Sequence, residues 1–116
     1  MEWLVVFTEK YEAWFQELLA KDKAAIATDL EVLRSLGPML GRPYVDHVKS
    51  SAFPNLKELR TGFAGHSYRT LFAFDPERKA ILLIGGDKKG KNQQKFYQQL
   101  IAQADAIFSE YLKKDK

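Results

Sequence analysis

Positively charged and hydroxyl-bearing side chains gather in the second half of the chain, where they could act on an RNA phosphodiester. Cleavage of RNA through its own 2′-hydroxyl needs a group that accepts the hydroxyl proton, a group that protonates the departing 5′-oxygen, and positive charge beside the phosphorane. None of these steps requires a metal ion. The side chains that could supply them are Lys57, Glu58, Arg60, His66, Tyr68, Arg69, Lys88, Lys89, Lys91 and Tyr97.

Several of these residues also have a purely structural interpretation. Glu58 could act as the general base, but residues two apart on a strand share a face, so it could instead position Arg60 through a salt bridge. Tyr97 lies on the same apolar stripe as Phe96 and could belong to the core. For Arg69 a functional role is favoured, because a charged side chain in an apolar strand needs a partner, which an anion would supply.

Other common kinds of active site are not supported by the sequence. The glycine-rich run over residues 85–90 lacks the spacing of a phosphate-binding loop. His47 and His66 have no acidic or cysteine partner at ligand spacing, so we expect no metal ion and no other cofactor. The adjacent serines at 50–51 are not within the motif of a hydrolase nucleophile.

The composition is typical of a single globular domain spanning residues 1–116. The chain is 46% hydrophobic and contains no Cys, and a chain of this length can form a core without crosslinks. It has no apolar run of about 18 residues and no basic leader, so we expect a soluble, cytoplasmic protein that does not bind membranes. Net charge is −3 for residues 1–36 and +5 for residues 37–92, and this basic middle favours a polyanionic partner.

The first third of the chain predicts a strand followed by two helices. The apolar run 3–7 is typical of a short strand, and Thr8 is suited to begin a helix with an apolar stripe. Asp22 is expected to cap a second helix. Gly37 and Pro38 should end it, because glycine accepts a left-handed backbone and proline cannot continue a helix.

The rest of the chain predicts three strands and a final helix. Residues 39–54 are mostly loop, with room for a short strand over 44–48, and the apolar runs 56–61, 67–74 and 80–84 are separated by turn sequences. Gly85 and Gly86 are expected to break the third strand, and Asn92 to cap the helix. The order β-α-α-β-β-β-α indicates an α+β fold with a mainly antiparallel, twisted sheet and the helices packed on one face. The other face would offer cations to a nucleic acid backbone.

Three motifs resemble the RelE/ParE toxin superfamily, and they look closest to its HigB-like, phage-associated branch. They are Leu56–Arg60, Tyr68–Phe72 and Ala80–Gly90, followed by a helix that contains Ala104 and Asp105. The resemblance covers nearly the whole chain and implies a RelE-like fold and a toxin of a type II toxin–antitoxin pair. In this superfamily the RelE and HigB branches cut mRNA in the ribosomal A site without a metal, whereas the ParE branch poisons DNA gyrase.

The resemblance also implies roles for individual residues. Arg69 matches the arginine that contacts the scissile phosphate, and Arg60 matches the arginine beside it. Lys88 and Lys89 fall where the family has a basic residue that protonates the leaving group or stabilises the phosphate, and Tyr97 falls where several members carry a catalytic or stacking tyrosine. RelE has lysines on the first meander strand where this chain has Leu56 and Glu58, so the base is left open among Glu58, Lys57 and His66.

These arguments lead to one main expectation and two alternatives. We expect a ribosome-dependent mRNA endonuclease that is neutralised by a cognate antitoxin of the helix-turn-helix type. The alternatives are a ParE-like toxin that inhibits DNA gyrase without cutting RNA, and a degenerate module that only binds its partner. The candidate catalytic residues are Arg69, Arg60, Lys88, Lys89, Tyr97 and Glu58, and the candidate RNA-binding residues are Lys57, His66, Tyr68 and Lys91.

Overall fold

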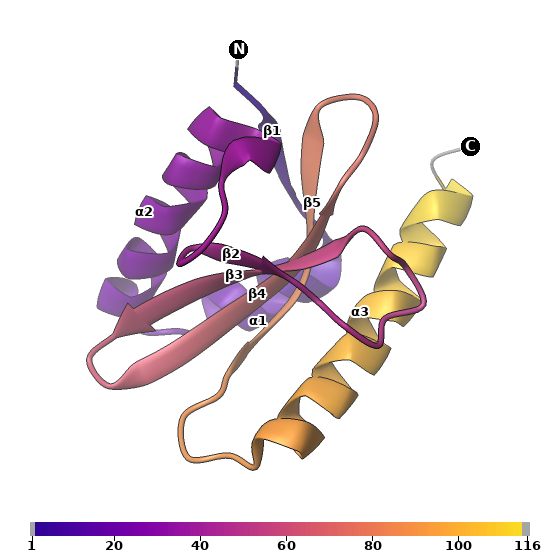
Figure 1. The fold of residues 1–116 in the computed structure, drawn as a ribbon. Helices are drawn as coiled ribbons and strands as arrows, with labels where there is room; N and C mark the ends of the chain where they lie inside the picture. Colours follow the sequence, from indigo (N-terminus) through magenta and orange to yellow (C-terminus); the bar gives the residue numbers. More distant parts are fainter. Residues whose placement is uncertain (1, 115–116) are drawn as a thin grey trace.

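The computed structural model describes residues 2–114. The chain begins with β1 (Leu4–Phe7), α1 (Glu9–Gln16), α2 (Ala20–Leu36) and a short 3-10 helix, η1 (Gly37–Met39). It continues with β2 (Val45–His47), β3 (Leu56–Phe63), β4 (His66–Phe74), β5 (Lys79–Asp87) and α3 (Gln93–Lys114) (Figure 1). None of the helices in the described part of the chain is both long enough and apolar enough to cross a membrane.

The strands form one five-stranded sheet in the order β1-β5-β4-β3-β2. β2, β3, β4 and β5 pair in antiparallel fashion, whereas β1 lies parallel to β5 at the edge of the sheet. The predicted meander and the α+β class with a mainly antiparallel sheet are therefore confirmed.

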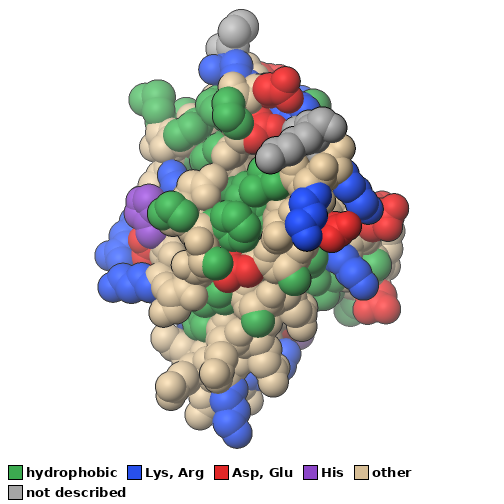
Figure 2. All heavy atoms as spheres, turned by 90° about the vertical axis from the view of Figure 1, so that its right-hand side faces the viewer, with side chains coloured by type: hydrophobic (Ala, Val, Ile, Leu, Met, Phe, Trp, Pro, Cys, Tyr) green, Lys and Arg blue, Asp and Glu red, His purple; other side chains and the backbone are tan. Residues whose placement is uncertain are grey.

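The helices cover both faces of the sheet, so the expectation that they share one face is wrong in that detail (Figure 1). Phe72 packs with Tyr11 of α1 and Ile26 of α2, whereas its neighbours Leu71 and Ala73 belong to a second core built with α3. The apolar runs of β4 and β5 are nearly continuous rather than alternating, and such runs are typical of strands buried on both faces. Figure 2 views the α3 side, where hydrophobic side chains gather in the middle and Lys and Arg side chains lie toward the margins.

The predicted helix starts are confirmed at two of three places. The Thr8 side chain accepts a hydrogen bond from the backbone N–H of Tyr11 at the start of α1. Asn92 accepts one from the N–H of Lys95 at the start of α3. Asp22 does not cap α2, which already begins at Ala20, and its buried carboxylate instead accepts a hydrogen bond from the hydroxyl of Tyr68.

Gly85 and Gly86 do not break β5, which continues to Asp87. A Cβ atom on Gly85 would lie 2.3 Å from the ring of Trp14, and one on Gly86 would lie 3.0 Å from the ring of Phe96. The two glycines therefore allow side chains from α1 and α3 to approach the strand from opposite faces.

Candidate active site

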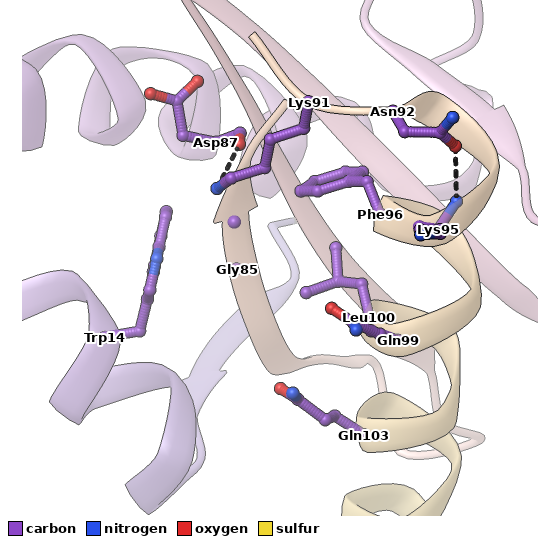
Figure 3. Close-up of a pocket in the computed structure, with 11 residues that line it drawn as sticks. Trp14, Gly85, Asp87, Lys91, Asn92, Lys95, Phe96, Gln99, Leu100 and Gln103 are labelled. Carbon is purple, nitrogen blue, oxygen red and sulfur yellow. Dashed lines mark hydrogen bonds between the residues drawn. The ribbon is translucent and has the colours of Figure 1, made fainter. Parts of the chain in front are cut away.

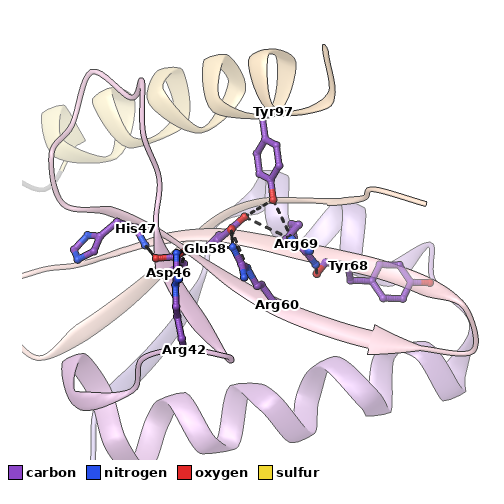
Figure 4. Close-up of polar contacts among 8 residues, drawn as sticks. All are labelled: Arg42, Asp46, His47, Glu58, Arg60, Tyr68, Arg69 and Tyr97. Carbon is purple, nitrogen blue, oxygen red and sulfur yellow. Dashed lines mark hydrogen bonds and ion pairs between the residues drawn. The ribbon is translucent and has the colours of Figure 1, made fainter. Parts of the chain in front are cut away.

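A polar cluster lies on the face of the sheet that α3 covers (Figure 4). Glu58 and Arg60 share this face of β3, Arg69 stands opposite Arg60 on β4, and Tyr97 extends toward them from α3. Lys88 follows the end of β5 and completes the group. We call these five residues the Tyr97 cluster. They come from three strands or strand ends and one helix, so only the folded chain brings them together.

The hydroxyl of Tyr97 joins a carboxylate to a guanidinium. Tyr97 Oη donates to Glu58 Oε1 at 2.7 Å and accepts from Arg69 Nε at 3.1 Å. Arg69 Nε lies 3.6 Å from Glu58 Oε1, and Arg69 also donates to the carbonyl oxygen of Tyr68. Glu58 and Arg69 are both buried, so their opposite charges must be paired within the protein.

Arg60 is held by two carboxylates. Its guanidinium donates to Glu58 Oε2 at 3.0 Å and to Asp46 Oδ2 at 3.2 Å. Asp46 also accepts from Arg42, and that hydrogen bond holds the pKa of the Asp46 carboxyl below its usual value. The Arg60 side chain is still 37% exposed, so it can meet a ligand at the surface.

The pKa values of Lys88 and Tyr97 move in opposite directions. Burial lowers the pKa of the Lys88 ammonium, and the nearby charge of Arg69 lowers it further. Burial and the hydrogen bond to Glu58 raise the pKa of the Tyr97 hydroxyl. Lys88 Nζ lies 5.7 Å from the centroid of the Tyr97 ring. The cluster therefore pairs a neutral hydroxyl donor with an ammonium group that gives up its proton more easily than an ordinary lysine.

Three of the other candidates from the sequence lie on the opposite face of the sheet. Tyr68 is buried there against α2, and His66 stacks on its ring with Nδ1 2.6 Å from Asp87 Oδ2. Lys57 places its ammonium 5.4 Å from the ring centroid of Phe74, on that same face. These side chains do not share a surface with the Tyr97 cluster.

Lys89 and Lys91 are exposed in the loop between β5 and α3. Lys91 donates to the carbonyl oxygen of Asp87 at 2.9 Å, and the backbone N–H of Lys89 donates to the Asp87 carboxylate. Within residues 2–114, no group of three or more His, Cys, Asp or Glu side chains is arranged as a metal site.

Sequence reasoning missed Asp46 and Arg42, which help to position Arg60. Asp46 stands opposite Glu58 in the pairing of β2 with β3. The sequence held part of the evidence for Asp46, because Val45-Asp46-His47 places an acidic residue in an edge strand. The role of Asp46 depends on the register between β2 and β3. That register cannot be predicted from the sequence, because residues 48–55 form a loop between the two strands.

Comparison with known proteins identifies the family. Residues 13–109 match the family described as Phage derived protein Gp49-like (DUF891). HigB3 of Mycobacterium tuberculosis is 48% identical over 101 residues, which cover 87% of this chain and 86% of HigB3. HigB2 of the same organism is 44% identical over 105 residues, which cover 90% of this chain but only 52% of HigB2, so the chain spans about half of that relative. Both relatives are named as candidate toxins.

Solved structures share the fold at low sequence identity. E. coli toxin RelE, solved as a mutant in the free state, gives a TM-score of 0.64 at 11% identity, covering 88% of this chain and 96% of that one. A chain of the toxin–antitoxin complex RelBE2 from M. tuberculosis gives a TM-score of 0.60 at 17% identity. The match covers 75% of this chain and 99% of that one. The chain therefore belongs to the Gp49-like family, is similar to the HigB relatives and shares its fold with RelE.

Proposed function

We propose that this chain is the toxin of a type II toxin–antitoxin pair and that it cuts mRNA on the ribosome without a metal ion. The family and its named relatives support the toxin role. The observation that carries the nuclease proposal is the Tyr97 cluster, in which one hydroxyl contacts a buried carboxylate and a guanidinium beside an ammonium of lowered pKa.

The proposed reaction has three proton transfers. Tyr97 Oη accepts the proton of the RNA 2′-hydroxyl while its own proton passes to Glu58 Oε1, 2.7 Å away. The 2′-oxygen bonds to the adjacent phosphorus, and the bond from phosphorus to the 5′-oxygen breaks. Lys88 gives its proton to that 5′-oxygen. The products are a 2′,3′-cyclic phosphate and a 5′-hydroxyl. Solvent then returns a proton to Lys88 and removes the proton that Glu58 gained.

The remaining cations stabilise the phosphorane. Arg60 presents an exposed guanidinium that suits bidentate contact with phosphate oxygens, while Asp46 and Glu58 fix its position. Arg69 is more deeply buried and contributes by orienting Tyr97 and adding positive charge. Lys89 is exposed beside Lys88 and would contact a neighbouring phosphate.

We also propose that a cognate antitoxin of the helix-turn-helix type neutralises the chain and that both act in the cytoplasm. Solved relatives in fold include toxins bound to antitoxins, among them the intact E. coli RelBE complex. An antitoxin could inhibit by covering the Tyr97 cluster or by blocking entry to the ribosome.

The test is induced expression of wild type and variants in cells, with mapping of mRNA ends. We expect growth arrest and codon-phased cuts from the wild type, and neither from Arg69→Ala. Because Arg69 is buried, Arg60→Ala serves as a second variant at an exposed position, and Arg34→Ala on α2 is the control. Growth arrest with intact mRNA and altered DNA supercoiling would replace the nuclease proposal with the gyrase alternative. Antitoxin binding without arrest would indicate a module that only binds its partner.

A further inference from the structure

A second polar cluster lies on the α2 face of the sheet, around the end of β5. His66 lies between two carboxylates, with Nδ1 2.6 Å from Asp87 Oδ2 and Nε2 3.9 Å from Asp22 Oδ2. The His66 ring stacks on that of Tyr68, whose hydroxyl donates to Asp22. We call these four residues the His66 cluster. The proposed reaction gives none of them a direct role.

Asp87 uses both of its carboxylate oxygens within the protein. Oδ2 contacts His66, while Oδ1 accepts from the backbone N–H groups of Ser67 and Lys89, each at 3.0 Å. Burial raises the pKa of the Asp87 carboxyl, but these three hydrogen bonds outweigh burial and hold the pKa below its usual value. Asp87 is therefore a carboxylate at neutral pH, and this carboxylate points away from α3 (Figure 3).

Asp87 and Lys88 are consecutive in the chain, but their side chains lie on opposite faces of the sheet. Side chains alternate along a strand, and Asp87 pairs in register with Tyr68 on the α2 face. The Lys88 N–H bonds to the carbonyl of Ser67 at 2.8 Å, which continues the ladder between β4 and β5 by one residue. The Lys88 ammonium consequently lies on the α3 face, 5.7 Å from the ring centroid of Tyr97.

Hydrogen bonds hold the main chain on both sides of Lys88. Ser67 donates to the Asp87 carboxylate and accepts from Lys88, and the same carboxylate spans Lys88 to reach the N–H of Lys89. An aspartate that only stabilised this turn would need one oxygen. The second oxygen of Asp87 contacts His66, and so the turn is also tied to α2 through Asp22.

We infer that Asp87, oriented by His66, is a positioning residue that holds the Lys88 ammonium in the Tyr97 cluster. The carboxylate fixes the main chain of Lys88 from the α2 face, and the alternation of the strand then directs the lysine side chain toward Tyr97. The inference rests on the proposed function only in taking Lys88 as the acid. His66 would then affect cleavage without touching RNA.

The first test is the pKa of Lys88, which is measured without RNA. The purified chain carries carbon-13 at the lysine Cε atoms and is titrated by NMR, and the Lys88 signal is assigned by its loss in Lys88→Arg. Burial and then the charge of Arg69 lower this pKa in the wild type. We expect Asp87→Ala to raise it, because the released ammonium moves into solvent and away from Arg69. Loss of the Asp87 charge alone would lower it, so the sign separates repositioning from direct electrostatics.

Asp75→Ala is the matched control. Asp75 also accepts from two backbone N–H groups, those of Glu77 and Lys79, but in the turn at the other end of β4 and β5. It should leave the pKa of Lys88 unchanged. His66→Ala, which keeps the aspartate, should raise the pKa by less than Asp87→Ala. If circular dichroism shows that Asp87→Ala does not fold, His66→Ala alone decides the question.

The second test is a double-mutant cycle on single-turnover cleavage of ribosome-bound mRNA. Asp87→Ala should slow cleavage about 10- to 100-fold by misplacing Lys88. It should slow Lys88→Ala no further, because both changes act through the same ammonium. A role of Asp87 that is independent of Lys88 would slow both backgrounds equally.

An unchanged or lowered pKa of Lys88 in the folded variants, or equal slowing in both backgrounds, would overturn the inference. A raised pKa in the variants together with a wild type that leaves mRNA intact would support the inference and disprove the nuclease alone. Cleavage by the wild type with a Lys88 pKa that the variants do not raise would do the reverse.

Discussion

Each carboxylate oxygen of Glu58 has its own partner, since one accepts from Tyr97 and the other from Arg60. The residue types and their alternation on β3 were sufficient to predict that Glu58 and Arg60 share a face. They could not predict the contact with Tyr97, because that depends on how α3 crosses the sheet. The Tyr97 ring packs against the α3 core, as one interpretation of the sequence predicted, and its hydroxyl lies in the cluster, where its catalytic role stays a prediction.

Replacing the Tyr97 hydroxyl is the most direct test of the proposed proton relay. Tyr97→Phe keeps the ring but removes the atom that links the 2′-hydroxyl to Glu58. We expect single-turnover cleavage of ribosome-bound mRNA to slow by about 10²–10⁴-fold. Tyr44→Phe, at an exposed position, is the matched control and should cleave normally. A Tyr97→Phe variant with wild-type rates would remove the tyrosine from the mechanism.

The lowered pKa of Lys88 predicts the pH dependence of cleavage. Lys88 must be protonated to act as the acid, so the rate should fall as pH rises through its pKa, which burial and then Arg69 hold below that of an ordinary lysine. Lys88→Arg should cleave more slowly. The fall of its cleavage rate with rising pH should occur at higher pH, because a guanidinium keeps its proton. The measurement is a pH profile of the cleavage step. Identical profiles for the two proteins would contradict the role of Lys88 as the acid.

At the level of elements, hydrophobic patterns and turn residues were sufficient to predict the strands, the helices and their order. The patterns failed where a residue's role depends on a distant partner. Gly85 and Gly86 were predicted to end β5, because glycine pairs in a short sequence commonly mark turns. Only the packing of Trp14 and Phe96 explains why glycine is needed within the strand.

Substitution at Gly85 tests this explanation. Gly85→Ala places a methyl group 2.3 Å from Trp14, so the ring or the strand must move, and we expect a loss of about 1–3 kcal/mol in the free energy of unfolding. Gly41→Ala adds its methyl group in open space and should change stability by less than about 0.5 kcal/mol. Urea titration followed by tryptophan fluorescence measures both. Equal midpoints for Gly85→Ala and wild type would show that the close approach is not required.

Across the whole molecule, the two faces of the sheet separate residues that the sequence grouped together. Charge along the chain indicated a basic middle, but it could not show that Lys57 and His66 lie on the α2 face while Arg60 and Lys88 lie on the α3 face. The nearly continuous apolar runs of β4 and β5 were the overlooked evidence for a sheet covered on both faces.

The face that carries the Tyr97 cluster should dominate the salt dependence of RNA binding. Each phosphate contact to a single strand contributes about 0.7 to the slope of log affinity against log salt concentration. Lys89→Ala should therefore reduce that slope by about 0.7. The cleavage rate at saturating mRNA should stay unchanged. Lys113→Ala, near the other end of α3, should leave the slope unaltered. The slopes are measured by titrating labelled mRNA at several salt concentrations, and equal slopes for Lys89→Ala and wild type would remove Lys89 from the contact surface.

The parallel pairing of β1 with β5 has a consequence for how the chain is made. Translation proceeds from the N-terminus, so Leu4–Phe7 emerges long before its partner Lys79–Leu82, and Tyr97 emerges later still. The sheet edge cannot close on a nascent polypeptide until residues 79–82 have been synthesised. A growing chain therefore carries no assembled Tyr97 cluster to the very ribosome that is synthesising it.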